Sequence, residues 1–248
     1  MKRVIFLVLL FGSLASTINA QIWKMRRWEV SGAIGTTKFF GDIGGLPSGI
    51  NGPGFKDIII NHARFSGSLG MRYRFYDNFS ARFGLSMGLI YATDDDGSYE
   101  DRGLEATTAL FEPVVTAEYF LVKNSTKDIY SFLKRRRVFE SVFSKLDVYA
   151  YAGVAPLIYR VSANEKLASI MEKDGGVTLA FPAGLGVNYV VSPNVLLGID
   201  IGLRYTTTDY LDGYASQYSN SNDVYYFMTF VFTHKLKTSE KGLPSFRK

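Results

Sequence analysis

The sequence predicts an all-β fold, an eight-stranded antiparallel up-and-down transmembrane β-barrel with a filled lumen. Three observations support this prediction. Apolar and polar residues alternate over runs longer than the ~5–6 residues usual in strands of globular proteins. The polar face of these runs combines arginines with serines and glycines. Short and long connections also alternate along much of the chain. Membrane strands need roughly 9–11 residues, with one face in lipid and the other toward a polar interior.

The stretch 62–91 carries the clearest pattern. Its first half places Phe65, Leu69 and other large apolar residues on one face, with arginines, serines and glycines on the other. After a predicted turn at 76–78, the second half repeats the same division as far as Tyr91. Successive side chains of a strand point to opposite faces, so the stretch predicts two long strands joined by a tight turn. A soluble sandwich would expose the polar face to water, where so many small residues beside arginine are not expected.

Six further strands follow from the same alternation, although the facing of the last one is not assigned. The predicted strands outside the hairpin are 27–40, 104–122, 146–161, 177–191, 195–207 and 223–236. The predicted connections are a Gly/Pro-rich loop 41–61, an acidic loop 93–103, a basic connection 123–145, a polar loop 162–176, a turn 192–194 and a loop 208–222.

The lengths of these connections predict the orientation of the barrel. Outer-membrane barrels place short turns in the periplasm and longer loops outside the cell. The order of connections here fits an even number of strands with both termini in the periplasm. The basic connection 123–145 is the exception, because it is long and lies on the periplasmic side.

The first 20 residues predict a cleaved signal peptide. Lys2 and Arg3 precede an apolar run at 4–11, and small or polar residues then lead to Ala20. This run is too short to span a membrane as a helix. The predicted organisation is therefore a signal peptide at 1–20, a barrel at 21–237 and a periplasmic tail at 238–248. The expected location is the cell outer membrane, with outer-membrane lipid around the barrel.

The interior is expected to hold a lumen ion-pair network of both signs. An eight-stranded barrel is just wide enough for side chains to fill it, and an unpaired buried charge is very costly. Ion pairs in a filled lumen are therefore preferred over a solute or proton path. The predicted inward charges are Glu29, Arg64, Arg72, Arg74, Arg82, Glu112, Glu118, Asp147, Asp200 and Arg204.

Catalysis is not predicted. The histidines, His62 and His234, fall at opposite rims of the predicted barrel and cannot share a site. The chain has no cysteine, so disulfides and thiol chemistry are excluded. An acidic run at 94–96 could bind calcium, but a solvated loop is the preferred interpretation. No enzyme activity, cofactor, metal or small-molecule substrate is expected, and the net charge of +5 is too small to indicate nucleic acid.

The basic connection is the best candidate for a partner contact. It contains four consecutive cations, and apolar residues alternate with its charges in a spacing that could form a short amphipathic helix. The alternative is an interfacial segment that meets lipid headgroups. The candidate contact residues are Lys134, Arg135, Arg136 and Arg137.

Several motifs together resemble those of a known family. They are 39–45 (FFGDIGG), 72–75 (RYRF), 79–82 (FSAR), Glu112, 118–119 (EY) and 208–212 (TDYLD). With them the chain resembles the PorG-like outer-membrane β-barrels of the Bacteroidetes type IX secretion system. The resemblance implies a non-enzymatic component of protein secretion and gliding motility that contacts the lipoprotein of the periplasmic ring and its partner. The alternative is a generic OmpA- or OmpW-like barrel for envelope integrity or passage of a small hydrophobic solute.

Overall fold

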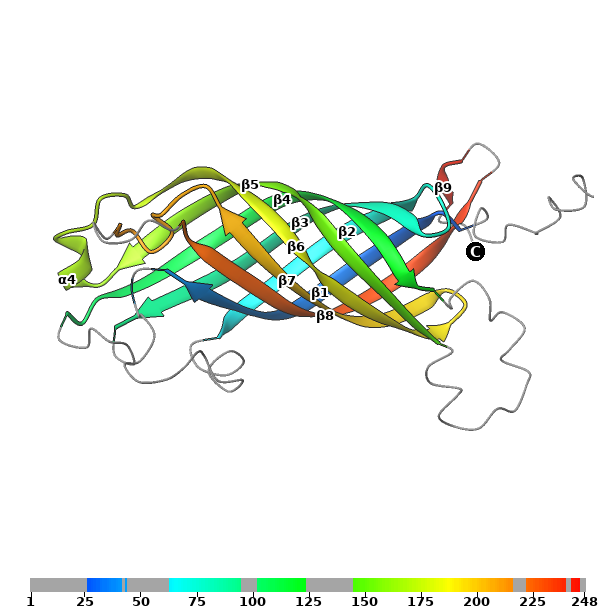
Figure 1. The fold of residues 1–248 in the computed structure, drawn as a ribbon, viewed down its shortest axis with the longest axis horizontal. Coiled ribbons are helices and arrows are strands. Elements are labelled where there is room, and N and C mark those ends of the chain that lie inside the picture. Colours follow the sequence, from blue (N-terminus) through cyan, green and yellow to red (C-terminus); the bar gives the residue numbers. More distant parts are fainter. Residues whose placement is uncertain are drawn as a thin grey trace, which may run out of the picture.

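In the computed structural model, eight long antiparallel strands form a closed barrel (Figure 1). The described residues are 26–41, 43, 63–94, 102–123, 145–215, 222–239 and 242–245. The strands are β1 (Trp28–Phe40), β2 (Arg64–Arg74), β3 (Phe79–Thr93), β4 (Glu105–Val122), β5 (Leu146–Ala163), β6 (Gly175–Ser192), β7 (Val195–Thr206), β8 (Val224–Thr238) and the two-residue β9 (Pro244–Ser245). Each pairs with its neighbour in sequence, and β1 pairs with β8 to close the sheet. The predicted fold class is confirmed.

The barrel has two distinct ends. The start of β1, the end of β8 and the turn after β2 lie at one end, which we call the terminus end (Figure 1). The helix α4 (Glu165–Ala168) lies at the opposite end, which we call the loop end (Figure 1). The described chain contains no helix long and apolar enough to cross a membrane.

Two small elements lie outside the sequence prediction. The helix α4 occupies the predicted polar loop 162–176, and Asn164 caps it by accepting a hydrogen bond from the Leu167 backbone N–H at 2.9 Å. In the predicted tail, β9 pairs with the end of β8. The Trp28 indole N–H donates to the Gly242 carbonyl at 2.9 Å, which ties this hairpin to β1. Residues 242–245 therefore fold back on the terminus end of the barrel.

The outer surface is apolar between two aromatic borders. Outward side chains such as Leu69 and Phe230 are more than half exposed, at 69% and 62%. At the terminus end, the rings of Trp28 and Tyr73 lie 4.7 Å apart. At the loop end, the rings of Phe40 and Tyr226 lie 5.5 Å apart. An exposed apolar band with aromatic girdles is the surface that a bilayer requires of a β-barrel.

The facing of β8, which the sequence left open, follows from its burial. Odd-numbered residues point inward and even-numbered residues point outward. Tyr225, at 0% exposure, and Phe227, at 3%, pack inside, whereas Phe230 and Phe232 face out. Both faces of this strand are rich in large apolar residues, so alternation alone could not assign it.

The interior is divided into an apolar half and a charged half. Toward the loop end, buried residues from β1, β3, β4, β5 and β8 form a continuous hydrophobic core that includes Phe39, Leu110, Leu157 and Tyr225. Toward the terminus end, inward positions are mostly charged or polar. The same alternating strands thus fill one half by packing and the other by ion pairing.

The close contact between β4 and β5 requires glycine at position 153. A β-carbon built on Gly153 would lie 2.1 Å from the Val115 carbonyl oxygen and 2.8 Å from the Thr116 α-carbon. These are backbone atoms, which cannot rotate away as the end of a side chain can. Glycine at this position therefore lets the two strands approach where the barrel wall curves.

We expect Gly153→Ala to lower the free energy of unfolding by about 1–3 kcal/mol, because the added methyl overpacks the wall. Urea titration of the barrel in lipid vesicles measures this change. Gly32→Ala is the matched control, since its β-carbon would meet only the Leu69 side chain at 3.6 Å. An equal loss in both variants would contradict the close-approach explanation.

Candidate functional site

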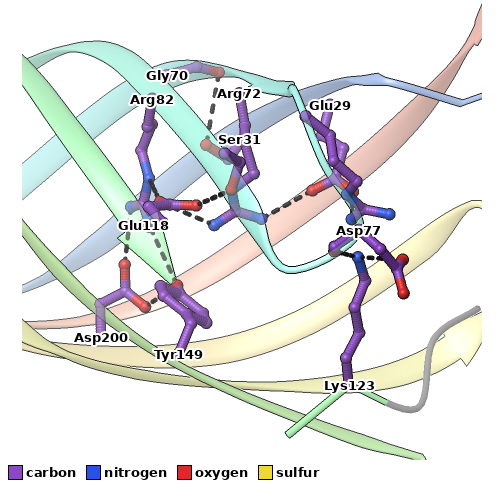
Figure 2. Close-up of polar contacts among 12 residues, drawn as sticks. Glu29, Ser31, Gly70, Arg72, Asp77, Arg82, Glu118, Lys123, Tyr149 and Asp200 are labelled. Atoms are coloured by element: carbon purple, nitrogen blue, oxygen red, sulfur yellow. Dashed lines mark hydrogen bonds and ion pairs between the residues drawn. The ribbon is translucent and has the colours of Figure 1, made fainter. Parts of the chain in front are cut away.

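A chain of ion pairs crosses the charged half of the interior (Figure 2). It begins at Glu29 on β1, whose carboxylate accepts hydrogen bonds from Arg74 and Arg72, each at 2.7 Å. Arg72 then reaches Glu118 on β4 with its Nη2 atom at 3.2 Å from Oε1. Glu118 in turn accepts from Arg82 on β3 at 2.5 Å. Each guanidinium therefore lies between carboxylates or beside one.

The far end of this chain reaches β5 and β7. Arg82 donates to Asp200 at 2.8 Å and to the Tyr149 hydroxyl at 3.1 Å. The Tyr149 hydroxyl donates to the second oxygen of Asp200. Ser80 completes the set by donating to Glu118 at 3.0 Å. We call these residues the lumen network: Glu29, Arg72, Arg74, Ser80, Arg82, Glu118, Tyr149 and Asp200.

Aromatic rings line the lumen network. Phe120 lies 5.7 Å from the guanidinium carbons of both Arg72 and Arg74, measured to the ring centroid. The Tyr149 ring lies 5.1 Å from that of Arg72. Cation–π attraction strengthens when the cation is shielded from water, and Phe120 is only 2% exposed. Packing and charge therefore hold the same arginines in place.

Glu112 and Arg204 form a separate pair nearer the loop end. Glu112 is fully buried and lies 3.7 Å from the Arg204 Nε atom. Its other oxygen accepts a hydrogen bond from the Tyr225 hydroxyl. The Arg204 guanidinium stacks over the Phe227 ring at 4.0 Å and donates to the Gly202 carbonyl at 2.7 Å. Two of the ten predicted inward charges thus meet outside the lumen network.

The other predicted residues lie elsewhere. Asp147 is buried, at 1% exposure, at the terminus end of β5 and opposite Asn188 of β6. Arg64, at the loop end of β2, stacks over the Tyr91 ring at 4.3 Å. Its register partner is the buried Thr37, so Arg64 keeps the predicted inward alternation. Among the described residues, however, no ion pair joins it to a carboxylate, so it does not belong to the lumen network. The candidate contact residues 134–137 lie outside the described residues, as does His62.

Lysines near the terminus end were missed by sequence reasoning. Lys123, just after β4, donates to both the carboxylate of Asp77, at 2.9 Å, and its backbone carbonyl. Lys235 on β8 is 6% exposed and pairs in register with Glu29. The inward position of Lys235 could have been predicted only if the facing of β8 had been known. Lys123 ends a strand, where alternation no longer predicts direction.

The connections at the loop end fold into a cap that the sequence did not predict. The Asp212 carboxylate accepts the backbone N–H groups of Ile43 and Tyr214, both at 3.1 Å. Leu211 is fully buried, its N–H donates to Asp223 at 2.7 Å, and its carbonyl accepts from Thr108 at 2.6 Å. The cap therefore joins the motif 39–45 to the motif 208–212.

A second carboxylate holds the connection between β3 and β4 in the cap. Asp94 is fully buried and binds Arg102 through both oxygens, at 2.8 and 3.1 Å. It also accepts the Leu104 N–H at 3.2 Å. These bonds occupy the one residue of the acidic run 94–96 that the structure describes, which leaves it poorly suited to an exposed calcium loop.

A small cavity lies inside the described barrel. One interior cavity of about 50 Å³ lies between the lumen network and the apolar core, bordered by Arg82, Thr116, Tyr151, Pro182 and Phe227. A water molecule needs about 10–15 Å³ by this measure, so the cavity holds only a few waters. Across the described ranges, no group of three or more His, Cys, Asp or Glu side chains is placed to hold a metal.

Comparison with known families identifies the chain at the level of the family. Residues 2–239 match the family described as "Domain of unknown function (DUF6089)". The chain belongs to this family. No curated protein matches the sequence of this DUF6089 barrel.

Among solved structures, the DUF6089 barrel is similar to several small outer-membrane proteins. Neisserial surface protein A is 13% identical with a TM-score of 0.44, over 84% of this chain and 96% of the other. OprG from Pseudomonas aeruginosa is 11% identical with a TM-score of 0.43, over 84% and 92%. A major outer membrane protein from Thermus thermophilus is 13% identical with a TM-score of 0.43, over 84% and 99%.

We expect Glu118→Gln to lower the free energy of unfolding of the DUF6089 barrel by about 3–5 kcal/mol, because it leaves Arg72 and Arg82 without their shared carboxylate. Urea titration in lipid vesicles measures the loss. Glu165→Gln is the control, since Glu165 is exposed on α4 and the change there should stay within about 1 kcal/mol. A small effect at Glu118 would show that the lumen network is dispensable.

A second prediction concerns pH. Burial, helped by the nearby charge of Arg74, lowers the pKa of Lys123 from 10.5 to about 8, and Asp77 offsets this only in part. Between these two values the unfolded chain binds more protons than the folded one, so the contribution of Lys123 to stability rises with pH across that window. Subtracting the pH profile of Lys123→Met from that of the unchanged protein measures this rise. A stability difference that stays constant across this pH window would contradict the prediction.

Proposed function

We propose that this DUF6089 barrel is a non-enzymatic outer-membrane component of the type IX secretion and gliding machinery, which anchors or contacts its periplasmic ring. The filled interior carries this proposal. The lumen network, the pair of Glu112 with Arg204 and the cap occupy the space that a channel would need. A barrel without a pore acts through its surfaces, and an anchor in the membrane is the simplest such role.

The motifs behind the family resemblance support the proposal in a second way. Arg72, Arg82 and Glu118 belong to these motifs and meet in the lumen network. The motifs 39–45 and 208–212 meet in the cap through Ile43 and Asp212. The resemblance thus rests on residues that build one folded unit rather than on scattered short matches.

The proposed contact lies on the periplasmic side. The end of β4 and the start of β5, which this connection joins, lie at the terminus end, on the side of the turn after β2 (Figure 1). Its cations at 134–137 would meet an acidic surface of the ring lipoprotein or of its partner. Bilayer headgroups are the competing anion for the same charges.

Neutralising residues 134–137 to glutamine tests this contact. We expect loss of the ring lipoprotein and its partner when the tagged barrel is purified from gently solubilised outer membrane, because charge complementarity guides such contacts. Mass spectrometry of the co-purified proteins provides the measurement. The control variant, Lys166→Gln with Lys173→Gln, changes cations at the loop end and should keep both partners.

Two outcomes separate the candidate functions. If both partners are recovered unchanged with the neutralised connection, the contact lies elsewhere. If the unchanged barrel recovers no ring component and its deletion leaves protein secretion intact, the generic OmpA- or OmpW-like role replaces the proposed one.

A further inference from the structure

Three prolines lie in the middle of adjacent strands of the barrel wall. Pro113 is on β4, Pro156 on β5 and Pro182 on β6. Proline has no N–H to donate, and within sheets it is confined to edge strands, strand starts and bulges. A closed barrel has no edge. These positions therefore need an explanation beyond strand formation.

Pro113 and Pro156 lie directly opposite each other. The pairing of Phe111 with Ile158 and of Val115 with Val154 places them in one row, and the ladder between β4 and β5 is interrupted there. In an antiparallel ladder, hydrogen-bonded pairs alternate with pairs that share no hydrogen bond. The Asn164 N–H donates to the Glu105 carbonyl at 3.1 Å, so these two residues form a hydrogen-bonded pair. Counting in twos from that row, the two prolines occupy a hydrogen-bonded pair. Neither can donate, so both bonds of the row are lost.

The ladder between β5 and β6 has a similar break. The Val161 N–H donates to the Asp174 carbonyl at 2.8 Å, so Gly153 and Pro182 form a hydrogen-bonded row between β5 and β6. The pairing is interrupted at this row as well, between Ala152–Ala183 and Ala155–Ala180. The carbonyl of Gly153 receives no hydrogen bond from Pro182. The middle of β5 is thus weakly held on both sides.

Alanines lie beside these breaks on both faces of the wall, and the interior cavity borders the break at Pro182. Ala155 and Ala180 point inward and are fully buried, while Ala152 and Ala183 point outward. Val114, Thr116 and Pro182 border the cavity of about 50 Å³. On the outer face, the apolar neighbours of Pro113 and Pro156 are only partly covered, at 39–47% exposure, so a molecule in the bilayer can reach the row between them; they are Phe111, Val115, Val154 and Ile158. On the inner face Leu157 is fully buried beside Ala155.

We propose that the wall at these prolines is a lateral entrance, through which small uncharged molecules pass between the bilayer core and the interior cavity. The carbonyls of Pro113 and Pro156 face each other without a strand donor and accept hydrogen bonds from a molecule in the gap. The fitting ligand is small, mostly apolar and carries a hydrogen-bond donor. This inference does not depend on a role in secretion.

A single-cysteine experiment tests the entrance, because the chain has no cysteine of its own. Ala155→Cys places a thiol inside the barrel at the broken row. The full-length protein in lipid vesicles is treated with methyl methanethiosulfonate, a small uncharged reagent that partitions into lipid. The thiolate takes its methylthio group and releases methanesulfinate. Mass spectrometry follows the rate of the mixed disulfide.

Two controls identify the route. Ser66→Cys places an equally buried thiol on β2, where the ladder with β1 is continuous and Ser66 is the last residue that pairs with β3. A charged reagent, 2-sulfonatoethyl methanethiosulfonate, reports entry from water. We expect the uncharged reagent to modify position 155 at least tenfold faster than position 66, and the charged reagent to modify both slowly. Equal rates at the two positions, or equally fast modification of position 155 by the charged reagent, would overturn the proposal.

Restoring the missing donors provides the decisive comparison. Adding Pro113→Val and Pro156→Val to Ala155→Cys should slow its modification at least tenfold, whereas adding Pro193→Ala, in the turn before β7, should not. An unchanged rate in the double valine variant sinks the proposal. If a cysteine variant fails to fold, hydrogen exchange of the unchanged protein decides instead. The peptide around 153–157 should exchange faster than the middle of β1, and equal protection would count against an entrance.

Discussion

The pairing of charges inside a closed cylinder is the constraint on which this structure depends. Alternation sends every second residue of each strand inward, and an eight-stranded barrel leaves no room for those charges to keep their water. Glu118 shows how the constraint is met, because it accepts from Arg82 and Arg72 on two other strands. The lumen network therefore links strands that are distant around the wall. Ion pairs across the lumen, as well as backbone hydrogen bonds between neighbouring strands, hold the strands in their places.

The two halves of the interior meet this constraint differently. The terminus half holds its charges in a continuous chain from Arg74 to Asp200. The loop half packs apolar side chains such as Phe39 and Leu157 in one core, with the pair of Glu112 and Arg204 beside it. It uses the buried carboxylates of Asp94 and Asp212 to tie loop backbone into place. A buried carboxylate that receives several N–H groups acts as the anchor of a loop, so each half is closed by a different chemistry.

Alternation predicted the strands and most of the inward charges, because a period of two is imposed by backbone geometry. It could not predict that Arg82 meets Asp200, since that contact depends on how strongly the strands tilt around the barrel. It also failed where the pattern weakens. Arg64, at a strand end, lies over the Tyr91 ring instead of joining the lumen network, and Lys235 lies on a strand with apolar residues on both faces. The cap residues follow no period, so Leu211 gave no signal of burial.

The lumen network explains how the barrel wall tolerates the hydrogen bonds that are missing at the prolines. Pro113 precedes Glu118 along β4, so the missing hydrogen bonds lie beside the part of the wall that the ion pairs brace. Cross-lumen salt bridges hold β1, β2, β3, β4 and β7 together at the terminus end, the hydrogen bonds of Tyr149 add β5, and the apolar core holds the strands together at the loop end. A wall secured at both ends can lose donors at its centre without coming apart. Local opening would then be confined to the rows around Pro113 and Pro156, which lack backbone donors although Ala155 and Leu157 still pack in the apolar core.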